Sequence, residues 1–226
     1  MKPHVIMHMM KSLDGRITMD HWPKDKSKFD EVYEQLHTEL KGDAWIVGRT
    51  TMAEFGKGDA KPVTTSETFP RETWKAPDLG AGPYGIALDR SGKLHINISR
   101  ANDDAIIAVL SSDVSDDHLA ELRRDGISYI FAGQNEQLDL AKALETLAAE
   151  FGIKRLLLEG GGGINGSFLT AGLIDEISVL LLPLADGTAG PKLFDRDDAP
   201  AHKLELLGVD NLDDHVLHLR YAVIKD

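Results

Sequence analysis

The chain has 226 residues, of which 42% are hydrophobic and 27% are charged, ordinary values for a globular protein. Its formal net charge of −12 disfavours nucleic acid as a partner, and no apolar run approaches the ~20 residues that a membrane span needs. The chain contains no cysteine, which excludes disulfides, thiolate metal sites and a cysteine nucleophile. We expect a cytoplasmic protein, because the first residues lack the small-residue cleavage site of a signal peptide.

Apolar runs alternate with helical stripes along most of the chain. Short apolar runs between turn residues predict strands, and apolar residues three or four apart predict helices that face a core. Strands are expected at 5–10, 44–47, 84–88, 105–110, 127–132, 156–158 and 177–182, with helices starting near 27, 49, 115, 140 and 164. This alternation predicts a parallel sheet with right-handed crossovers, flanked by helices.

The last part of the chain has a different pattern. Residues 203–209 and 216–224 alternate partly between apolar and polar side chains, with turn residues at 211–214 between them. No helix intervenes, so we expect these last strands to be antiparallel. Residues 56–85 show no sustained period and are long for a connection, which indicates a functional loop or short elements. We find no linker and expect a single domain over 1–226.

One stretch, KRLLLEGGGGINGSFL at 154–169, joins a strand, four glycines and a helix start. Glycines let the backbone approach an anion closely, and free N–H groups at a helix start carry partial positive charge. Because four successive glycines are costly in chain entropy, we interpret the stretch as a phosphate-binding turn rather than a mere connection. It also fits G-x-G-x-x-G, but the acids that follow come too early for a Rossmann unit.

A second strand–glycine–helix junction follows residues 44–47. There, Gly48 precedes Arg49, Thr50 and Thr51. Arginine offers a bidentate charged fork and threonines offer further donors, so this group suits a phosphate. The alternative, a helix start that carries a surface arginine, stays open at this point.

The first expected strand ends in Ser12-Leu13-Asp14-Gly15. An Asp-Gly pair can simply form a turn, yet ligands in open α/β sheets bind at the carboxyl ends of strands. His4 and His8 share one face of this strand, but no carboxylate or third histidine joins them at useful spacing. We therefore expect no metal site.

These motifs resemble a known family. Residues 47–52, VGRTTM, are similar to the G-R-x-T helix start of dihydrofolate reductases, and 158–162, LEGGG, to their second glycine junction. SLDG at 12–15, EGGGGINGSFL at 159–169 and LIDE at 173–176 are closer still to the reductase domain of bacterial riboflavin biosynthesis. The resemblance covers nearly the whole chain. It implies a dihydrofolate reductase-like α/β fold, NADPH as cofactor, and reduction of a pyrimidine of the 5-amino-6-(5-phosphoribosylamino)uracil type or a related compound.

The resemblance also implies roles for particular residues. Arg49 with its threonines would contact the 2′-phosphate or pyrophosphate of NADPH, Asp89 to Ser91 the adenosine end, and Gly160 to Ile164 the pyrophosphate. Glu159 would lie on the nicotinamide side, and Asp14 would orient the substrate or supply a proton. The implied cofactor residues are Gly48, Arg49, Thr50, Thr51, Asp89, Arg90, Ser91, Glu159, Gly160, Gly161, Gly162, Gly163 and Ile164; those for substrate are Ser12 and Asp14; those for catalysis are Asp14 and Glu159.

Two departures from the family leave alternatives open. The segment after Thr51 is MAEFG where the riboflavin enzymes usually carry D-N-P, and the zinc-dependent deaminase half of the bifunctional enzymes has no counterpart here. A dihydrofolate reductase is one alternative, with Asp25 and Phe29 at the spacing of the pterin-binding acid, although Trp22-Pro23 reverses the usual order. A nucleotide-binding protein without catalysis is the other. We further expect a homodimer that acts on a small molecule.

Overall fold

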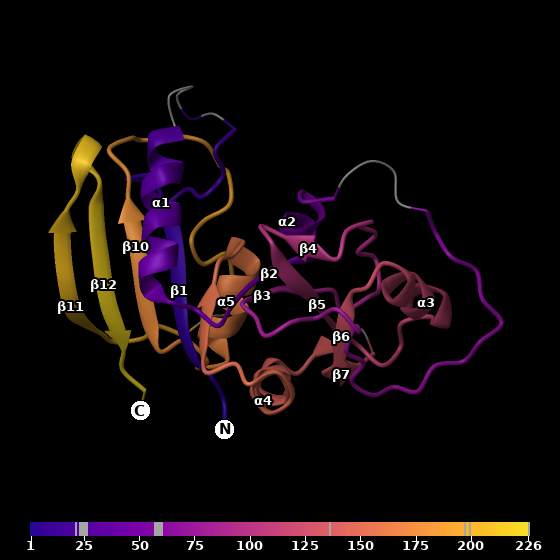
Figure 1. The fold of residues 1–226 in the computed structure, drawn as a ribbon. Coiled ribbons are helices and arrows are strands. Elements are labelled where there is room, and N and C mark those ends of the chain that lie inside the picture. Colours follow the sequence, from indigo (N-terminus) through magenta and orange to yellow (C-terminus); the bar gives the residue numbers. More distant parts are fainter. Residues whose placement is uncertain are drawn as a thin grey trace. The chain divides into compact units, whose positions relative to one another are not determined.

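The computed structural model describes residues 1–20, 22, 27–56, 61–135, 137–196, 198 and 200–225. The chain divides into two compact units (Figure 1). Unit 1 comprises Met1–Pro3 and Asp43–Lys154, and unit 2 comprises His4–Gly42 and Arg155–Asp226. Unit 2 is thus assembled from segments before and after the main segment of unit 1 in the sequence. The composition of the sequence shows no linker at these boundaries. A single domain over 1–226 stays a prediction.

Unit 1 contains a mainly parallel sheet. Strand β3 pairs in parallel with β2 and β5, and β5 pairs in parallel with β6 and antiparallel with β4. Residues 106–110 of β5 are fully buried, the continuous apolar run expected of a strand covered on both faces. The elements are β2 (Ala44–Gly48), α2 (Arg49–Ala53), β3 (Tyr84–Leu88), β4 (Arg100–Ala101), β5 (Asp104–Leu110), α3 (Asp116–Arg124), β6 (Ser128–Phe131), β7 (Gly133–Gln134), β8 (Gln137–Leu138) and α4 (Leu140–Phe151).

Unit 2 contains a mixed sheet in the order β11-β12-β10-β1-β9. Strand β1 pairs in parallel with β9 and β10, while β12 pairs antiparallel with β10 and with β11. The predicted parallel strands with an antiparallel C-terminal pair are confirmed. The elements are β1 (His4–Lys11), α1 (Ser27–Leu40), β9 (Arg155–Leu158), α5 (Gly162–Thr170), β10 (Glu176–Leu181), β11 (Leu204–Asn211), the 3-10 turn η1 (Asp213–His215) and β12 (Leu217–Val223).

Helix α1 lies across one face of the unit 2 sheet (Figure 1). Its apolar stripe packs on a buried cluster that includes Leu36 of the helix, Trp22 before it, and Leu180 and Leu182 at the end of β10. Phe29 and Val32 are partly buried against the same cluster. The predicted core-facing stripe is confirmed. Among the described residues, no helix is both long and apolar enough to cross a membrane.

The strands expected before residue 183 match the structure to within one residue at each end. Helix α5 differs, because it begins at Gly162, two residues before the expected start. Glycine carries no side-chain signal for a helix, so the sequence marks this start weakly. The irregular segment 56–85 contains no named helix or strand in its described residues before β3 begins at Tyr84, and 57–60 lie outside the described residues.

The described part of this segment is nonetheless anchored on α3 and β6. Backbone N–H groups of Thr65 and Phe69 donate to carboxylates at the start of α3, at 2.8 and 3.0 Å. Trp74 forms a backbone bridge with Tyr129 and stacks on its ring. The Arg123 guanidinium lies over the Phe69 ring, 4.3 Å from its centroid. These contacts hold an extended backbone in place without a regular element.

A row of polar side chains crosses the interior of the unit 2 sheet. His8 of β1 is fully buried, with Nδ1 3.0 Å from the Ser178 hydroxyl, which lies 2.8 Å from Nε2 of His218. The His8 ring stacks on Tyr33 of α1 with centroids 4.3 Å apart. Burial, together with the nearby His37 and His218, lowers the pKa of His8 from 6.5 to about 4. His8 is therefore neutral in the folded protein at neutral pH.

This arrangement predicts that stability declines in mild acid. The unfolded chain protonates His8 as the pH falls through 6.5, whereas the folded protein resists until about 4, so stability is complete above this window and lost on descending through it. At about pH 5 the loss from His8 alone is about 2 kcal/mol. Urea unfolding at about pH 7.5 and pH 5 should show this loss in the native chain, and His8→Asn should lack it. Equal pH dependence of the free energy of unfolding in the two proteins would contradict the assignment to His8. His218 is present in both proteins, so its contribution cancels in the comparison.

Candidate functional site

The parallel strands of unit 2 bring several predicted residues to one edge of the sheet. Met7 of β1 pairs with Leu158 of β9, and Lys11 pairs with Leu181 of β10. The segments that follow these three strands therefore leave the sheet at the same edge. They carry Asp14, Glu159 with the glycine turn, and the turn around residue 186. The carboxyl edge of such a sheet is where α/β proteins bind ligands.

Asp14 is held in a fixed position by both of its oxygens. Oδ1 accepts from the Ser12 hydroxyl at 2.7 Å and from the Asp186 N–H at 2.9 Å, and Oδ2 accepts from the Gly187 N–H at 2.9 Å. The Ser12 hydroxyl, followed by the two backbone donors, holds the pKa of Asp14 well below its usual range. The carboxylate is exposed and stays an anion near neutral pH. Its electrostatics suit orienting a substrate more than donating a proton.

Glu159 has the opposite environment. It directly follows β9, its side chain is 10% exposed, and Oε1 lies 2.7 Å from Nδ1 of His37 on α1. Burial raises the pKa of Glu159, against the opposing effect of His37 and of a hydrogen bond from Tyr33. A buried carboxyl whose pKa is raised toward neutrality, at the ligand-binding edge of a sheet, has the properties of a proton carrier.

The glycine turn contains two kinds of glycine. A Cβ on Gly162 would overlap the Lys192 carbonyl oxygen, and one on Gly166 would lie 2.8 Å from Cγ of Arg196. At Gly161 and Gly163, by contrast, a Cβ would meet no atom within 4 Å. Packing therefore requires glycine at positions 162 and 166. Gly161 and Gly163 instead border open space beside the first turn of α5. That space lies next to N–H groups that no intrahelical bond can use.

A segment that the sequence analysis left without a role joins these two features. Residues 184–196 run beside the turn after β1, where Leu13 N–H donates to the Leu184 carbonyl and Arg16 donates to the Gly190 carbonyl, both at 2.8 Å. The same segment then packs on α5: Asp195 N–H donates to the Gly162 carbonyl at 3.0 Å. The run of glycines in the sequence indicated that some group comes close to the backbone there. Nothing in the sequence identified residues 184–196 as one such partner.

Unit 1 assembles the other predicted cofactor residues. Gly48 of β2 pairs with Leu88 of β3, so Arg49 and Asp89 leave adjacent parallel strands at the same edge. The Arg49 and Arg90 side chains are exposed, and neither guanidinium makes a hydrogen bond or ion pair with another described residue. Two cations thus stand available for an anionic ligand. Thr50 and Thr51 lie in α2 directly after Arg49.

Asp89 has a different role from its neighbours. Its carboxylate is buried and accepts from the N–H groups of Lys93 and Leu94 at 3.0 and 2.8 Å. Burial alone would raise the pKa of Asp89, but His118 and these donors outweigh it and lower the pKa. The carboxylate therefore shapes the turn, which leaves Arg90 and Ser91 as the side chains that can reach a ligand. The dihydrofolate reductase alternative rested on Asp25 and Phe29, with Trp22-Pro23 in reversed order. Phe29 packs against the core, and Asp25 and Pro23 lie outside the described residues.

Several known proteins are similar to this chain over most of its length. The 2,5-diamino-6-ribosylamino-4(3H)-pyrimidinone 5′-phosphate reductase of Methanothermobacter thermautotrophicus is 29% identical over 190 residues, 83% of this chain and 81% of the relative. The riboflavin biosynthesis protein RibD of Bacillus amyloliquefaciens is 32% identical over 85% of this chain and 49% of its own length. A pyrimidine reductase-like protein from Corynebacterium diphtheriae superposes with a TM-score of 0.72 and 21% identity, over 99% of this chain and 93% of its own.

The fold is the dihydrofolate reductase-like α/β fold, as the resemblance implied. More particularly, the chain belongs to the RibD C-terminal domain family, whose model matches residues 3–218. It is an oxidoreductase, and membership implies a cofactor of the nicotinamide class. Within each unit, residues suited to a phosphate of such a group are present: the open space at Gly161 and Gly163 in unit 2, and the exposed arginines Arg49 and Arg90 in unit 1.

The division of the glycines predicts a contrast between neighbouring substitutions. Gly162→Ala forces its methyl group into the Lys192 carbonyl, so the free energy of unfolding should fall by about 2 kcal/mol or more, as for overpacked cores. Gly163→Ala is the matched control, since alanine in open space at a helix start should be neutral or stabilising by up to about 1 kcal/mol. Urea unfolding measures both. Equal stability of the two variants would mean that the 184–196 segment does not press on α5.

Proposed function

We propose that this chain reduces a 6-(ribosylamino)pyrimidine 5′-phosphate of riboflavin biosynthesis with NADPH as the hydride donor. The observation that carries the proposal is the match to proteins named as 2,5-diamino-6-ribosylamino-4(3H)-pyrimidinone 5′-phosphate reductases from three organisms, each over 82% or more of this chain. The chemistry of the site residues supports it. Exposed arginines and free backbone amides suit the phosphates of the cofactor. An anionic Asp14 suits binding of the substrate, and Glu159, with its raised pKa, suits transfer of one proton.

In unit 2 the glycine turn binds the pyrophosphate. The N–H groups at the start of α5 point out of the helix end and carry its partial positive charge. Gly161 and Gly163 leave room for phosphate oxygens to approach these donors. The contacting residues are Gly160 to Ile164, and Gly162 contributes through its packing on Lys192 as well.

In unit 1 Arg49 selects the phosphorylated cofactor. NADPH differs from NADH by a 2′-phosphate, and a guanidinium binds phosphate in a bidentate fork. Thr50 and Thr51 offer hydroxyl donors beside Arg49, after Gly48 at the end of β2. Arg90 and Ser91 contact the adenosine end, in a turn that the buried carboxylate of Asp89 holds in shape.

The two acids divide the work on the substrate. The nicotinamide, when bound, supplies the hydride, so the protein has to orient the reacting sugar carbon, exclude water and manage one proton. Asp14, a permanent anion fixed by Ser12 and the 186–187 turn, orients the substrate through hydrogen bonds to its hydroxyl or amino groups. Glu159, whose pKa burial raises, carries the proton, and its contact with His37 fixes its position.

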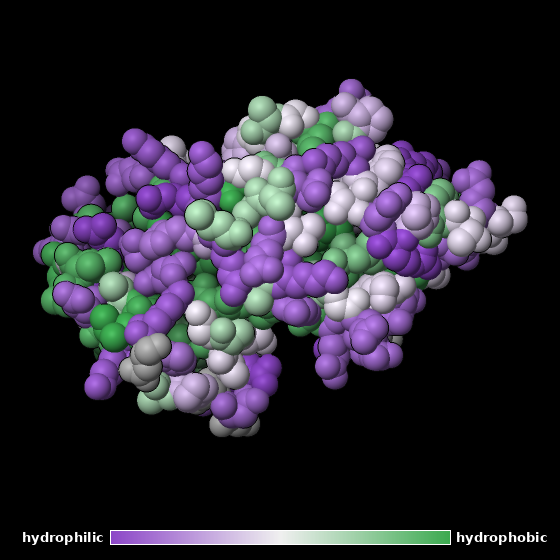
Figure 2. Space-filling view, turned by 90° about the horizontal axis from the view of Figure 1, so that it is seen from below, coloured by the Kyte–Doolittle hydropathy of each residue, from purple (hydrophilic) through white to green (hydrophobic). Residues whose placement is uncertain are grey.

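The homodimer that we expected has a candidate surface on β11, the edge strand of the unit 2 sheet. The apolar side chains of this strand are exposed, at 45% for Leu204, 56% for Leu206, 45% for Leu207 and 52% for Val209. Figure 2 shows a hydrophobic cluster at the side of the molecule where β11 lies. Exposed apolar patches of this kind commonly mark protein contacts, and a second copy would also cover the unpaired strand edge. Such a dimer would work in the cytoplasm.

The function is tested by following NADPH oxidation in the presence of the 2,5-diamino pyrimidinone substrate, its 5-amino uracil counterpart, and dihydrofolate. We expect turnover with one or both ribosylamino pyrimidines, and a preference for NADPH over NADH. Turnover with dihydrofolate alone would establish the pterin alternative. Cofactor binding without turnover on any substrate would establish the non-catalytic alternative.

Arg49→Ala tests the cofactor assignment. Charge-assisted hydrogen bonds contribute roughly 1.5–3 kcal/mol, so the Kd for NADPH should rise about tenfold or more. NADH, which lacks the 2′-phosphate, serves as the internal control and should bind both proteins alike. Fluorescence titration with the two cofactors measures this. An equal loss of affinity for NADH would mean that Arg49 contacts a part that the two cofactors share.

Asp14→Asn tests the substrate assignment. The variant keeps the shape of the side chain but loses its charge, so kcat on the pyrimidine should fall about ten- to a hundredfold, the effect of losing one charge-assisted hydrogen bond, while NADPH affinity stays within about twofold. The control is Asp213→Asn, an exposed aspartate on η1. If kcat falls only in step with NADPH binding, Asp14 belongs to the cofactor site instead.

A further inference from the structure

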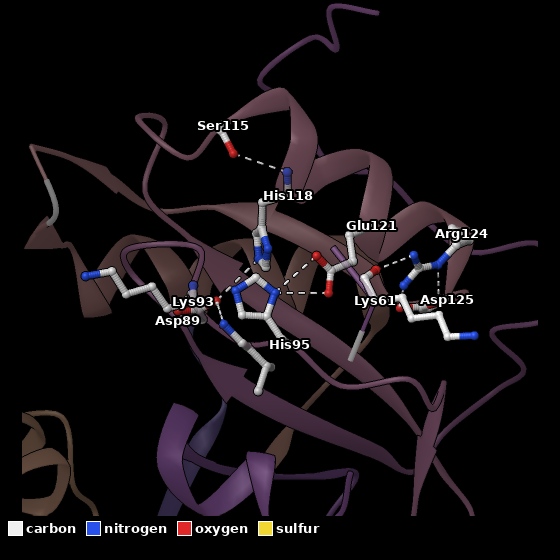
Figure 3. A network of polar contacts seen from close by, with 10 residues as sticks. Lys61, Asp89, Lys93, His95, Ser115, His118, Glu121, Arg124 and Asp125 are labelled. Atoms are coloured by element: carbon white, nitrogen blue, oxygen red, sulfur yellow. Dashed lines mark hydrogen bonds and ion pairs between the residues drawn. The ribbon is translucent and has the colours of Figure 1, made fainter. Parts of the chain in front are cut away.

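Unit 1 contains a cluster of potential metal ligands that the proposed reductase activity does not use. The cluster consists of His95, His118 and Glu121, which we call the His95 cluster (Figure 3). One ligand atom from each residue lies within 4.8 Å of the others. His118 and Glu121 are three residues apart on α3, hence on one face of the helix, and His95 follows the turn that Asp89 shapes.

The ring of His118 lacks hydrogen-bond partners in the interior. His118 is 3% exposed, and neither ring nitrogen makes a hydrogen bond with a described residue. An imidazole carries at least one N–H and, when neutral, one lone pair, so no tautomer satisfies this ring by itself. Leaving such groups unpaired in the interior costs roughly 1–3 kcal/mol each. A metal ion is the partner that an imidazole lone pair in this position fits.

Glu121 is a buried carboxylate whose described partner is another member of the cluster. It is 3% exposed, and the only described hydrogen bonds to its oxygens come from Nδ1 of His95, at 3.0 and 3.1 Å. Arg124, three residues later on α3, directs its guanidinium onto Asp125, with both hydrogen bonds at 2.7 Å (Figure 3). Buried carboxylates in proteins are normally paired or coordinate metals.

Asp89 completes the charge balance of this region. Its Oδ2 lies 3.4 Å from Nε2 of His118, within ion-pair distance, but the contact is not a hydrogen bond for the ring. The carboxylates of Asp89 and Glu121 carry a formal charge of −2 beside His118. A divalent cation cancels this charge. Carboxylates that flank metal-binding histidines are a common feature of metal sites.

We propose that the His95 cluster binds a divalent transition-metal ion of the zinc class. Two imidazoles and a carboxylate form a donor set that zinc accepts, whereas Mg²⁺ and Ca²⁺ prefer oxygen ligands alone. The His95 side chain is 44% exposed, so solvent reaches the cluster and supplies the fourth ligand. The ion cross-links the turn after β3 to helix α3. The residues are distant in the sequence, which is why spacing alone did not reveal them.

The test uses the full chain without a histidine tag, stripped of metal by a chelator and titrated with zinc chloride in a calorimeter. We expect one zinc ion per chain. At about a hundredfold excess over Kd the melting temperature should rise by roughly 5–10 °C, the effect of ligand linkage in a chain of this size. Magnesium chloride should leave the melting temperature unchanged. Binding of Co²⁺ should produce the visible absorption of a site with nitrogen and oxygen ligands.

His95→Ala is the main variant, because its half-exposed side chain can be removed without opening the core. The variant should raise the Kd for zinc by at least about a hundredfold. Removing a group that only hydrogen-bonds to a metal ligand typically weakens metal affinity by about 10–100-fold, so a larger loss identifies His95 as a ligand. Glu121→Gln should have the same effect. His215→Ala removes an exposed histidine of unit 2 and should bind zinc as the native chain does. The proposal is overturned if the native chain binds no zinc, or if His95→Ala binds it with unchanged affinity.

Discussion

The close approach of the Lys192 carbonyl to Gly162 is the constraint on which the unit 2 site depends. Only a residue without a side chain lets the 184–196 segment lie on the start of α5. From there the segment reaches back to the turn after β1, where it holds Leu13 and Arg16 and offers the Asp186 and Gly187 amides to Asp14. The glycine turn and the Asp14 turn therefore share one support. A change in either would be transmitted to the other through backbone contacts.

The two acids at this edge differ because of what surrounds them. Asp14 is exposed and receives three hydrogen bonds, which favour its charged form. Glu159 is enclosed beneath α1, and desolvation favours its neutral form even though His37 and Tyr33 oppose that effect. Reductases that add a hydride to an unsaturated carbon need both a fixed anion or dipole for orientation and a group that can carry a proton. Under the proposed function, Asp14 and Glu159 take these two roles from neighbouring strands at one sheet edge.

In unit 1, Asp89 connects the two proposed functions. Its carboxylate holds the turn that carries Arg90 and Ser91, and the same carboxylate faces His118 of the His95 cluster. A metal ion on that cluster would fix His118 and the turn together, since both ends of the turn would then be tied to α3. Occupancy of the metal site would thereby make the Arg90 side of the cofactor site more rigid.

The amino-acid sequence by itself determined the strands, most helix positions, the parallel arrangement with an antiparallel end, and the family. Hydrophobic period and turn residues act over a few neighbours, and the motifs at residues 12–15, 48–51 and 159–166 are contiguous, so both can be read locally. The tertiary structure alone decided which of the four glycines serve packing and which border open space. It also decided that Asp14 is bound by the 186–187 turn, that His8 and Ser178 meet inside the sheet, and that His95 meets α3. Each of these depends on which distant segments the sheet order and register bring together, and no local preference encodes that.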